Sequence, residues 1–183
     1  MWDVNMKYGV IIGRFQPFHK GHEYVVRSII KKGYKPIIMI GSPNVKNEKN
    51  PLSFEKRKEL IEMIFDDVII EPLEDNENWD IWYEDILRII KKHTDELEKI
   101  TFFIHIKSND KDTFIFKGKE YKGVHYVKIF EDEGFEVINL DKFTNKNQYI
   151  HATDIRKDEN YAKEHLDEKI YKRLKDWGFW GNF

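Results

Sequence analysis

The chain has 183 residues, of which 40% are hydrophobic and 15% aromatic, enough to build one domain with a full core. Its 31 basic and 33 acidic residues give a net charge of -2, so charge gives no reason to expect a nucleic-acid or membrane partner. The absence of cysteine excludes disulfides, thiolate metal sites and thiol nucleophiles. With no signal-peptide pattern and no apolar run of ~20 residues, we expect a soluble cytoplasmic protein.

Short apolar runs alternate with helical patterns along the chain. In chain order they predict a strand at 8–12, a helix at 22–30, a strand at 35–40, a helix at 54–65, a strand at 68–70, a helix at 79–90, a strand at 100–106, a short helix at 125–133, a strand at 135–140 and a helical segment at 153–177. Two polar stretches, 42–52 and 107–123, contain no clear element. Strands separated by helices predict an α/β fold, a Rossmann-like, doubly wound parallel sheet of about five strands with helices on both faces and a C-terminal helical tail.

Residues 13–22, Gly-Arg-Phe-Gln-Pro-Phe-His-Lys-Gly-His, directly follow the first predicted strand. In open parallel sheets ligands bind at the carboxyl ends of the strands, so we expect the chemistry here. Arg14 offers a fork of donors suited to phosphate. His19 and His22 would project near the start of the next helix, where backbone N–H groups already favour an anion, and Gly21 leaves room for a base or ribose. The pattern predicts a triphosphate site.

The two histidines also allow two other interpretations. In one, His22 only begins the buried face of its helix, since apolar residues follow it at helical spacing. In the other, the pair binds a metal ion, which is disfavoured because no carboxylate or third histidine lies nearby at ligand spacing.

A second candidate anion site lies after the last predicted strand. Thr153 is suited to cap the next helix, and Arg156, one turn later, would point back toward the strand ends. The alternative is an ordinary helix start. Together with residues 13–22, at the other end of the same domain, Arg156 predicts a two-sided cradle for phosphates.

The run from Gly13 to His22 resembles the HxGH motif of the nucleotidyltransferase superfamily, which includes the class I aminoacyl-tRNA synthetases. The longer string resembles the NMN adenylyltransferases, in particular the archaeal type and the similar domain of bifunctional NMN adenylyltransferase/Nudix enzymes. The segment 151–156 resembles the family's Ser/Gly-x-Thr-x-x-Arg motif, with His151 in place of the small residue. The ATP-binding residues that the resemblance implies are Gly13, Arg14, Phe15, His19, Gly21, His22, Thr153 and Arg156.

The middle of the chain carries weaker resemblances to the family's acceptor-binding segments. The acceptor-binding residues that they imply are Phe15, Gln16, Asn50, Arg57, Trp79, Trp82 and Asp112. Four of them have an alternative: a solvated basic loop and helix face for Asn50 and Arg57, a core position for Trp82 and a plain loop carboxylate for Asp112. The string 107–112 lacks the glycine that the relatives carry.

The resemblance implies transfer of AMP from ATP to NMN, giving NAD and pyrophosphate. The acceptor's phosphate would attack the α-phosphorus in line, and His19, His22, Arg14 and Arg156 would stabilise the charge. Mg²⁺ would be bound mainly through substrate phosphates, without a protein ligand. The expected partners are therefore ATP and a pyridine mononucleotide, with no nucleic acid and no membrane.

Several alternatives to this function stay open. Nicotinate mononucleotide, FMN or phosphopantetheine are other possible acceptors, and a non-catalytic nucleotide sensor is a further candidate. A kinase is disfavoured because the glycines at 118 and 123 are not followed by Lys-Ser/Thr. The resemblance covers roughly residues 7–157. We expect residues 1–157 to form the nucleotidyltransferase domain and 158–183 a helical extension packed on it, whose aromatic residues serve the core or a possible homo-oligomer.

Overall fold

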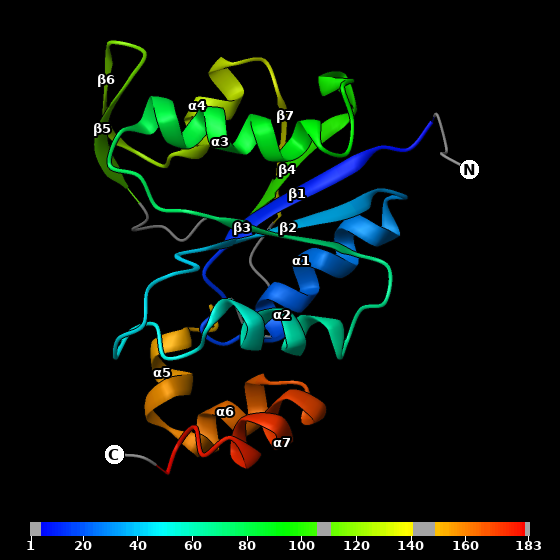
Figure 1. Cartoon of the computed structure of the whole chain (residues 1–183), viewed down its shortest axis with the longest axis vertical. Coiled ribbons are helices and arrows are strands. Elements are labelled where there is room, and N and C mark those ends of the chain that lie inside the picture. The colour runs from blue at the N-terminus through cyan, green and yellow to red at the C-terminus, as the bar shows by residue number, and fades with distance from the viewer. Residues whose placement is uncertain (1–4, 106–110, 141–148, 182–183) are drawn as a thin grey trace.

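The computed structural model describes residues 5–105, 111–140 and 149–181. Its centre is a parallel sheet of five strands in the order β3-β2-β1-β4-β7 (Figure 1). The strands are β1 (Tyr8–Gly13), β2 (Lys35–Gly41), β3 (Ile69–Leu73), β4 (Ile100–Ile104) and β7 (Glu136–Asn139). The chain runs from β1 to one edge and then returns to the other side of β1, so the order reverses between β1 and β4. The predicted doubly wound, Rossmann-like sheet is confirmed.

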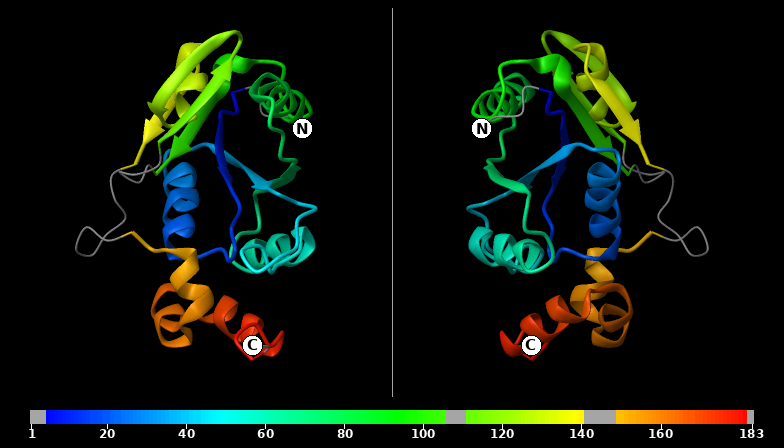
Figure 2. Two further views of the ribbon diagram at one scale, coloured as in Figure 1. Left: turned by 90° about the vertical axis from the view of Figure 1, so that its left-hand side faces the viewer. Right: turned by 90° about the vertical axis from the view of Figure 1, so that its right-hand side faces the viewer.

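Helices cover both faces of this sheet (Figure 2). They are α1 (Lys20–Lys31), α2 (Phe54–Glu62), α3 (Trp79–Lys91), α4 (Val127–Asp132), α5 (Ala152–Lys157), α6 (Glu159–His165) and α7 (Glu168–Asp176), with a 3-10 turn, η1 (Leu97–Lys99), before β4. No helix in the described ranges has the length and apolar character needed to cross a bilayer.

The strands divide their side chains between two hydrophobic clusters. Ile11 and Phe103 face a cluster built with α1, α2 and the C-terminal helices, whereas Val10 and Phe102 face a cluster built with α3 and α4. Successive residues of a strand point to opposite faces, so a strand buried on both sides reads as a continuous apolar run. This explains why β1 and β2 were recognisable in the sequence.

The prediction that residues 107–123 hold no helix or strand was wrong in part. Its described portion forms a two-stranded antiparallel hairpin, β5 (Asp112–Phe116) and β6 (Lys119–Val124), beside α3. Phe114, Phe116 and Tyr121 are buried in the α3-side cluster. Lys117 and Gly118 both have positive φ, as a tight hairpin turn requires. The alternation is short and irregular in the sequence, because the exposed Ile115 separates the two phenylalanines and charged residues flank Tyr121.

The segment predicted as one helical stretch from 153 to 177 is three short helices. Asp158 ends α5 and caps α6, whereas Leu166 ends α6 and Asp167 caps α7. Both aspartates have non-helical backbone and accept hydrogen bonds from following N–H groups. The predicted cap at Thr153 was also wrong. The helix begins one residue earlier, with His151 as its N-cap.

Candidate active site

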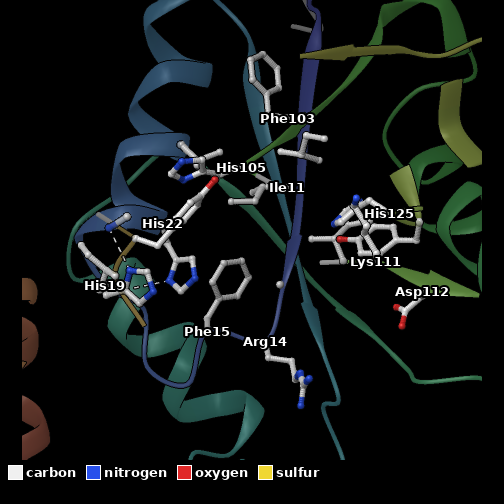
Figure 3. Close-up of a pocket in the computed structure, with 18 residues that line it drawn as sticks. Ile11, Arg14, Phe15, His19, His22, Phe103, His105, Lys111, Asp112 and His125 are labelled. Carbon is white, nitrogen blue, oxygen red and sulfur yellow. Dashed lines mark hydrogen bonds between the residues drawn. The ribbon is translucent and has the colours of Figure 1, made fainter. Parts of the chain in front are cut away.

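Three adjoining cavities open around the carboxyl end of β1, and Figure 3 shows the central one, which lies where the strand order reverses between β1 and β4. The central cavity, about 540 Å³, lies between the two strand ends and the start of α1. The α5 cavity, about 510 Å³, lies between residues 14–22 and α5. The tryptophan cavity, about 470 Å³, lies beside the start of α3. Arg14 lines all three, so it stands where they meet.

His19 and His22 form the start of α1 and share one hydrogen-bond motif. The Nδ1 of His19 accepts from the Gly21 N–H at 3.1 Å, and the Nδ1 of His22 accepts from the His19 N–H at 3.2 Å. The rings stack with their centres 3.6 Å apart. An imidazole whose Nδ1 accepts a hydrogen bond carries its proton on Nε2. Both rings are therefore fixed as Nε2–H donors, and both line the central and α5 cavities.

Two glycines make this arrangement possible. A Cβ on Gly21 would lie 2.9 Å from the His19 ring, and a Cβ on Gly13 would lie 2.9 Å from the Phe15 ring. The Phe15 ring meets His22 edge to face at 4.8 Å and is almost fully buried. Phe15 thus packs against the His22 ring, and it also lines the central and α5 cavities.

Arg156 crosses from α5 to the loop that carries the histidines. Its guanidinium donates to the Gln16 carbonyl at 2.8 Å and to the Thr153 hydroxyl at 3.2 Å. Burial, and then the positive charge of Arg14, lower the pKa of Arg156. Two guanidinium groups that repel each other across one cavity form a site suited to a polyanion. Thr153, Arg156 and Arg14 all line the α5 cavity, with Glu48 and Lys49 on its rim.

Arg57 does not occupy a cavity wall, contrary to the prediction that it contacts the acceptor. Its side chain is fully buried and donates to the carbonyls of Arg14, Gly41, Ser42 and Ser53. Burial lowers its pKa. The guanidinium thus ties the ends of β1 and β2 to α2.

Gln16 and Asn50 are also bound within the protein. The Gln16 amide donates to the Leu52 carbonyl and accepts from the Leu52 N–H, both at 2.9 Å, so it fixes the loop before α2 while its residue lines the α5 cavity. Asn50 is buried and donates to the Asn47 side chain at 3.0 Å. Its Oδ1 has no partner among the described residues, and it lines none of the three cavities.

The tryptophan cavity has an aromatic wall and an acidic rim. Trp79 and Trp82 lie edge to face at 5.2 Å, and Tyr126 lies edge to face with Trp82 at 5.3 Å. All three line the cavity, together with Asp75 and Glu77. Trp82 also packs against Phe130 of the core. The wall therefore offers aromatic faces and negative charge to a flat cation.

Several residues of the central cavity were missed by sequence analysis. His105, Tyr149 and Ile150 line it near α1, and Lys111, His125 and Tyr126 line it at the base of the hairpin, beside the predicted Asp112. The position of His105, directly after β4, is a signal that could have been used, because strand ends meet at the ligand crevice. Tyr126 had no such signal, since the hairpin brings it there. Residues 107–110 of the predicted acceptor string lie outside the described residues.

The charges around the α5 cavity bear on metal binding. Within the ranges that the structure describes, no three His, Asp or Glu side chains are grouped as a metal cage. The side chains that line the α5 cavity are chiefly cationic or N–H donors, so this lining offers few oxygen ligands to a divalent ion.

Comparison with known proteins agrees with this geometry. A nicotinamide-nucleotide adenylyltransferase from Archaeoglobus fulgidus is 29% identical, over 90% of this chain and 94% of the relative. A bifunctional NMN adenylyltransferase/ADP ribose pyrophosphatase from Francisella tularensis superposes with a TM-score of 0.72 at 29% identity, over 94% of this chain and 50% of that one. The same protein has been solved with AMP and a Mn ion, and that structure gives a TM-score of 0.70 at 29% identity, over 94% of this chain and 49% of that one. The cytidylyltransferase-like family matches residues 10–158. The chain therefore belongs to the cytidylyltransferase-like family, in agreement with the resemblance to nucleotidyltransferases seen in the sequence.

Proposed function

We propose that the protein is a nicotinamide-nucleotide adenylyltransferase, which transfers AMP from ATP to NMN and releases NAD and pyrophosphate. The observation that carries this proposal is the pair of imidazoles fixed as Nε2–H donors, set across one cavity from Arg156 and beside Arg14. The names of the relatives from Archaeoglobus fulgidus and Francisella tularensis support the choice of acceptor.

The triphosphate of ATP is assigned to the space between α1 and α5. His19 and His22 would donate to it from one side, and Arg156 and Thr153 would face it from the other. Adenosine is assigned to the central cavity, where Gly21 keeps the wall open and Phe103 and Ile150 provide apolar contact. Each assigned donor is held by a second hydrogen bond or ring contact, so little reorganisation accompanies binding.

The acceptor is assigned to the tryptophan cavity, with Arg14 facing its 5′-phosphate. Trp79, Trp82 and Tyr126 suit the cationic pyridinium, and Asp75 and Glu77 on the rim add negative charge toward it. Nicotinate mononucleotide carries a carboxylate in place of the carboxamide, and the acidic side chains Asp75 and Glu77 would repel it. The charge of the cavity therefore favours the amidated mononucleotide.

In the reaction, an oxygen of the NMN phosphate attacks the α-phosphorus of ATP in line. A new P–O bond forms, the bond to the β-phosphate oxygen breaks, and pyrophosphate leaves with that electron pair. The acceptor oxygen is already ionised, so the step needs no protein base. Arg14, His19, His22 and Arg156 stabilise the charge that spreads over the phosphoryl oxygens. When a divalent ion such as Mg²⁺ is bound with the substrates, it would supply further neutralisation of that charge.

One assay tests the proposal. Purified protein, ATP and Mg²⁺ are incubated with NMN, nicotinate mononucleotide, FMN or phosphopantetheine, and each dinucleotide or coenzyme product is separated and quantified with pyrophosphate. The expected result is NAD from NMN, with slower conversion of nicotinate mononucleotide. Product from FMN or phosphopantetheine alone would assign a different acceptor, and ATP binding without any product would favour a nucleotide sensor.

A further inference from the structure

The C-terminal extension contacts α5, the helix beside the α5 cavity, at a defined atom. The indole Nε1 of Trp180 donates to the carbonyl oxygen of Ile155 at 2.8 Å. Ile155 lies in α5 between Thr153 and Arg156, the two residues assigned to the ATP phosphates, and its side chain is fully buried. Figure 1 shows the chain returning from α7 toward α5 near its C-terminal end.

The sequence of the tail determines where Trp180 lies. After α7 the chain reverses at Gly178, whose φ is +72°, and the Phe179 N–H donates back to the Leu174 carbonyl at 3.0 Å. The Trp180 ring then packs against Tyr171 at 5.5 Å and Phe179 at 5.0 Å. These contacts fix the indole with its N–H toward α5.

The Ile155 carbonyl needs this donor because α5 stops one turn later. In a continuing helix it would accept from the N–H of residue 159. Asp158 instead has extended backbone, with φ -135° and ψ 106°, and caps α6. A buried helix-end carbonyl without a partner is costly, and the Trp180 indole meets that need.

Arg156, the residue after Ile155, is subject to electrostatic repulsion. Arg156 and Arg14 line the same cavity, and the positive charge of Arg14 repels that of Arg156. Repulsion between the two guanidinium groups favours movement of α5 away from the cleft. The bond from Arg156 to the Gln16 carbonyl and the bond from Trp180 to the Ile155 carbonyl both restrain α5 against such movement.

We propose that Trp180 is a positioning residue for ATP, which holds α5 through the Ile155 carbonyl so that Arg156 meets the phosphates. The proposal rests on the proposed function only in taking ATP as the nucleotide bound there. It also gives the aromatic tail a specific role beyond filling the core.

The test compares Trp180→Phe with Trp177→Phe. Both changes remove the same atoms from a half-buried tryptophan of the same tail, but the Trp177 ring packs against Lys56 and Arg173 at 5.0 and 5.9 Å rather than on α5. The dissociation constant for ATP is measured by calorimetric titration, with the KM for ATP, the KM for NMN, kcat and the unfolding temperature. Trp180→Phe is expected to weaken ATP about fivefold, the value of one hydrogen bond, with the KM for NMN unchanged. Trp177→Phe is expected to leave ATP affinity unchanged.

A double-mutant cycle with Arg156→Ala separates positioning from general loss of structure. If Trp180 acts through Arg156, Trp180→Phe adds nothing further to the ATP dissociation constant of the Arg156→Ala protein. Additive losses, or equal effects of the two tryptophan variants, would overturn the proposal. Normal ATP binding with no NAD produced would refute the proposed function alone, because the binding comparison is made without acceptor.

Discussion

His22 combines two tasks in one imidazole. Its Nδ1 accepts the His19 N–H and so completes the start of α1, while its Nε2 faces the cavities as a donor. Because the hydrogen bond to Nδ1 fixes the proton on Nε2, the bond that begins the helix also prepares the donor that we propose acts in catalysis. A substitution that separates the two tasks can therefore show which one the reaction uses.

We expect His22→Asn to keep the helix start and lose the donor. The asparagine Oδ1 lies near the position of Nδ1 and can accept the His19 N–H, but nothing reaches the position of Nε2. The kcat should fall about 10²-fold, as for loss of one transition-state donor, with little change in unfolding temperature. Steady-state kinetics and thermal unfolding, with His22→Ala as the variant that loses both tasks, make the comparison. An Asn variant with normal kcat would leave His22 a packing residue.

The polar residues differ in how far their positions followed from the sequence. Arg14, His19 and His22 lie in one contiguous run after a strand, so the carboxyl-end rule placed them at the cleft. Their individual roles remain predictions. Arg57 was placed wrongly because its partners are backbone carbonyls of β1, β2 and the loops around them, and these come together only in the folded chain. A basic residue on a helix carries no local sign of such burial.

One of the hydrogen bonds between the β5–β6 hairpin and α4 makes the stability of the protein depend on pH. The Tyr121 hydroxyl donates to the Asp132 carboxylate at 2.7 Å, and this bond lowers the pKa of Asp132. Burial, followed by the same bond, raises the pKa of Tyr121 to about 12. Asp132 thus contributes stability above its unfolded pKa of about 4, which is lost as the pH falls through the lower folded value. Tyr121 contributes stability below its unfolded pKa of about 10, and this stability is lost as the pH rises toward its folded pKa of about 12.

Tyr121→Phe should therefore cost stability only between these limits. Near pH 7 we expect a loss of about 1 kcal/mol in the free energy of unfolding, which shrinks below pH 4 and above pH 10. Urea unfolding at pH 3, 7 and 11 measures it. Tyr34→Phe, whose ring packs against Phe103 on the other face of the sheet, is the control. A difference that is the same at all three pH values would contradict the assigned bond.

The elements that sequence analysis missed share a physical cause. The three central strands, β1, β2 and β4, are mostly buried on both faces and stand out as apolar runs. The hairpin is buried on one face only, and its exposed positions are mostly charged. The three C-terminal helices carry one continuous apolar stripe, which concealed the breaks at Asp158 and Asp167. In both cases specific side-chain interactions, and not the hydrophobic periodicity, set where the helices and strands begin and end.

The C-terminal extension shares a hydrophobic core with the sheet. Leu166, Ile170 and Leu174 are almost fully buried in the same cluster as Phe18 and Ile40. Ile170→Ala should therefore destabilise the entire protein by about 2–5 kcal/mol, with loss of ATP binding at the same temperature as loss of helical signal. Differential scanning calorimetry, with the surface variant Lys172→Ala as control, should show one transition in every case. Two separable transitions would mean that residues 158–183 fold independently.

The order of the strands did not follow from periodicity, which reports only on local structure. The order places β1 at the centre of the sheet, with β4 beside it, and so opens the crevice directly above Gly13 and Arg14. Sequence patterning predicted the fold class and the end of the sheet that bears the chemistry. The side-by-side arrangement of the three cavities came from tertiary packing.

That Arg14 borders all three cavities has a thermodynamic consequence. If ATP and the acceptor both bind the same guanidinium, their binding free energies are coupled. The factor by which ATP changes the affinity for the acceptor then equals the factor by which the acceptor changes the affinity for ATP. Two phosphates that compete for one cation weaken each other until the bond between them forms. In the dinucleotide the two phosphates are covalently joined, so binding it does not require the enzyme to bring two separate anions together. The shared arginine therefore favours the bound product over the two bound substrates.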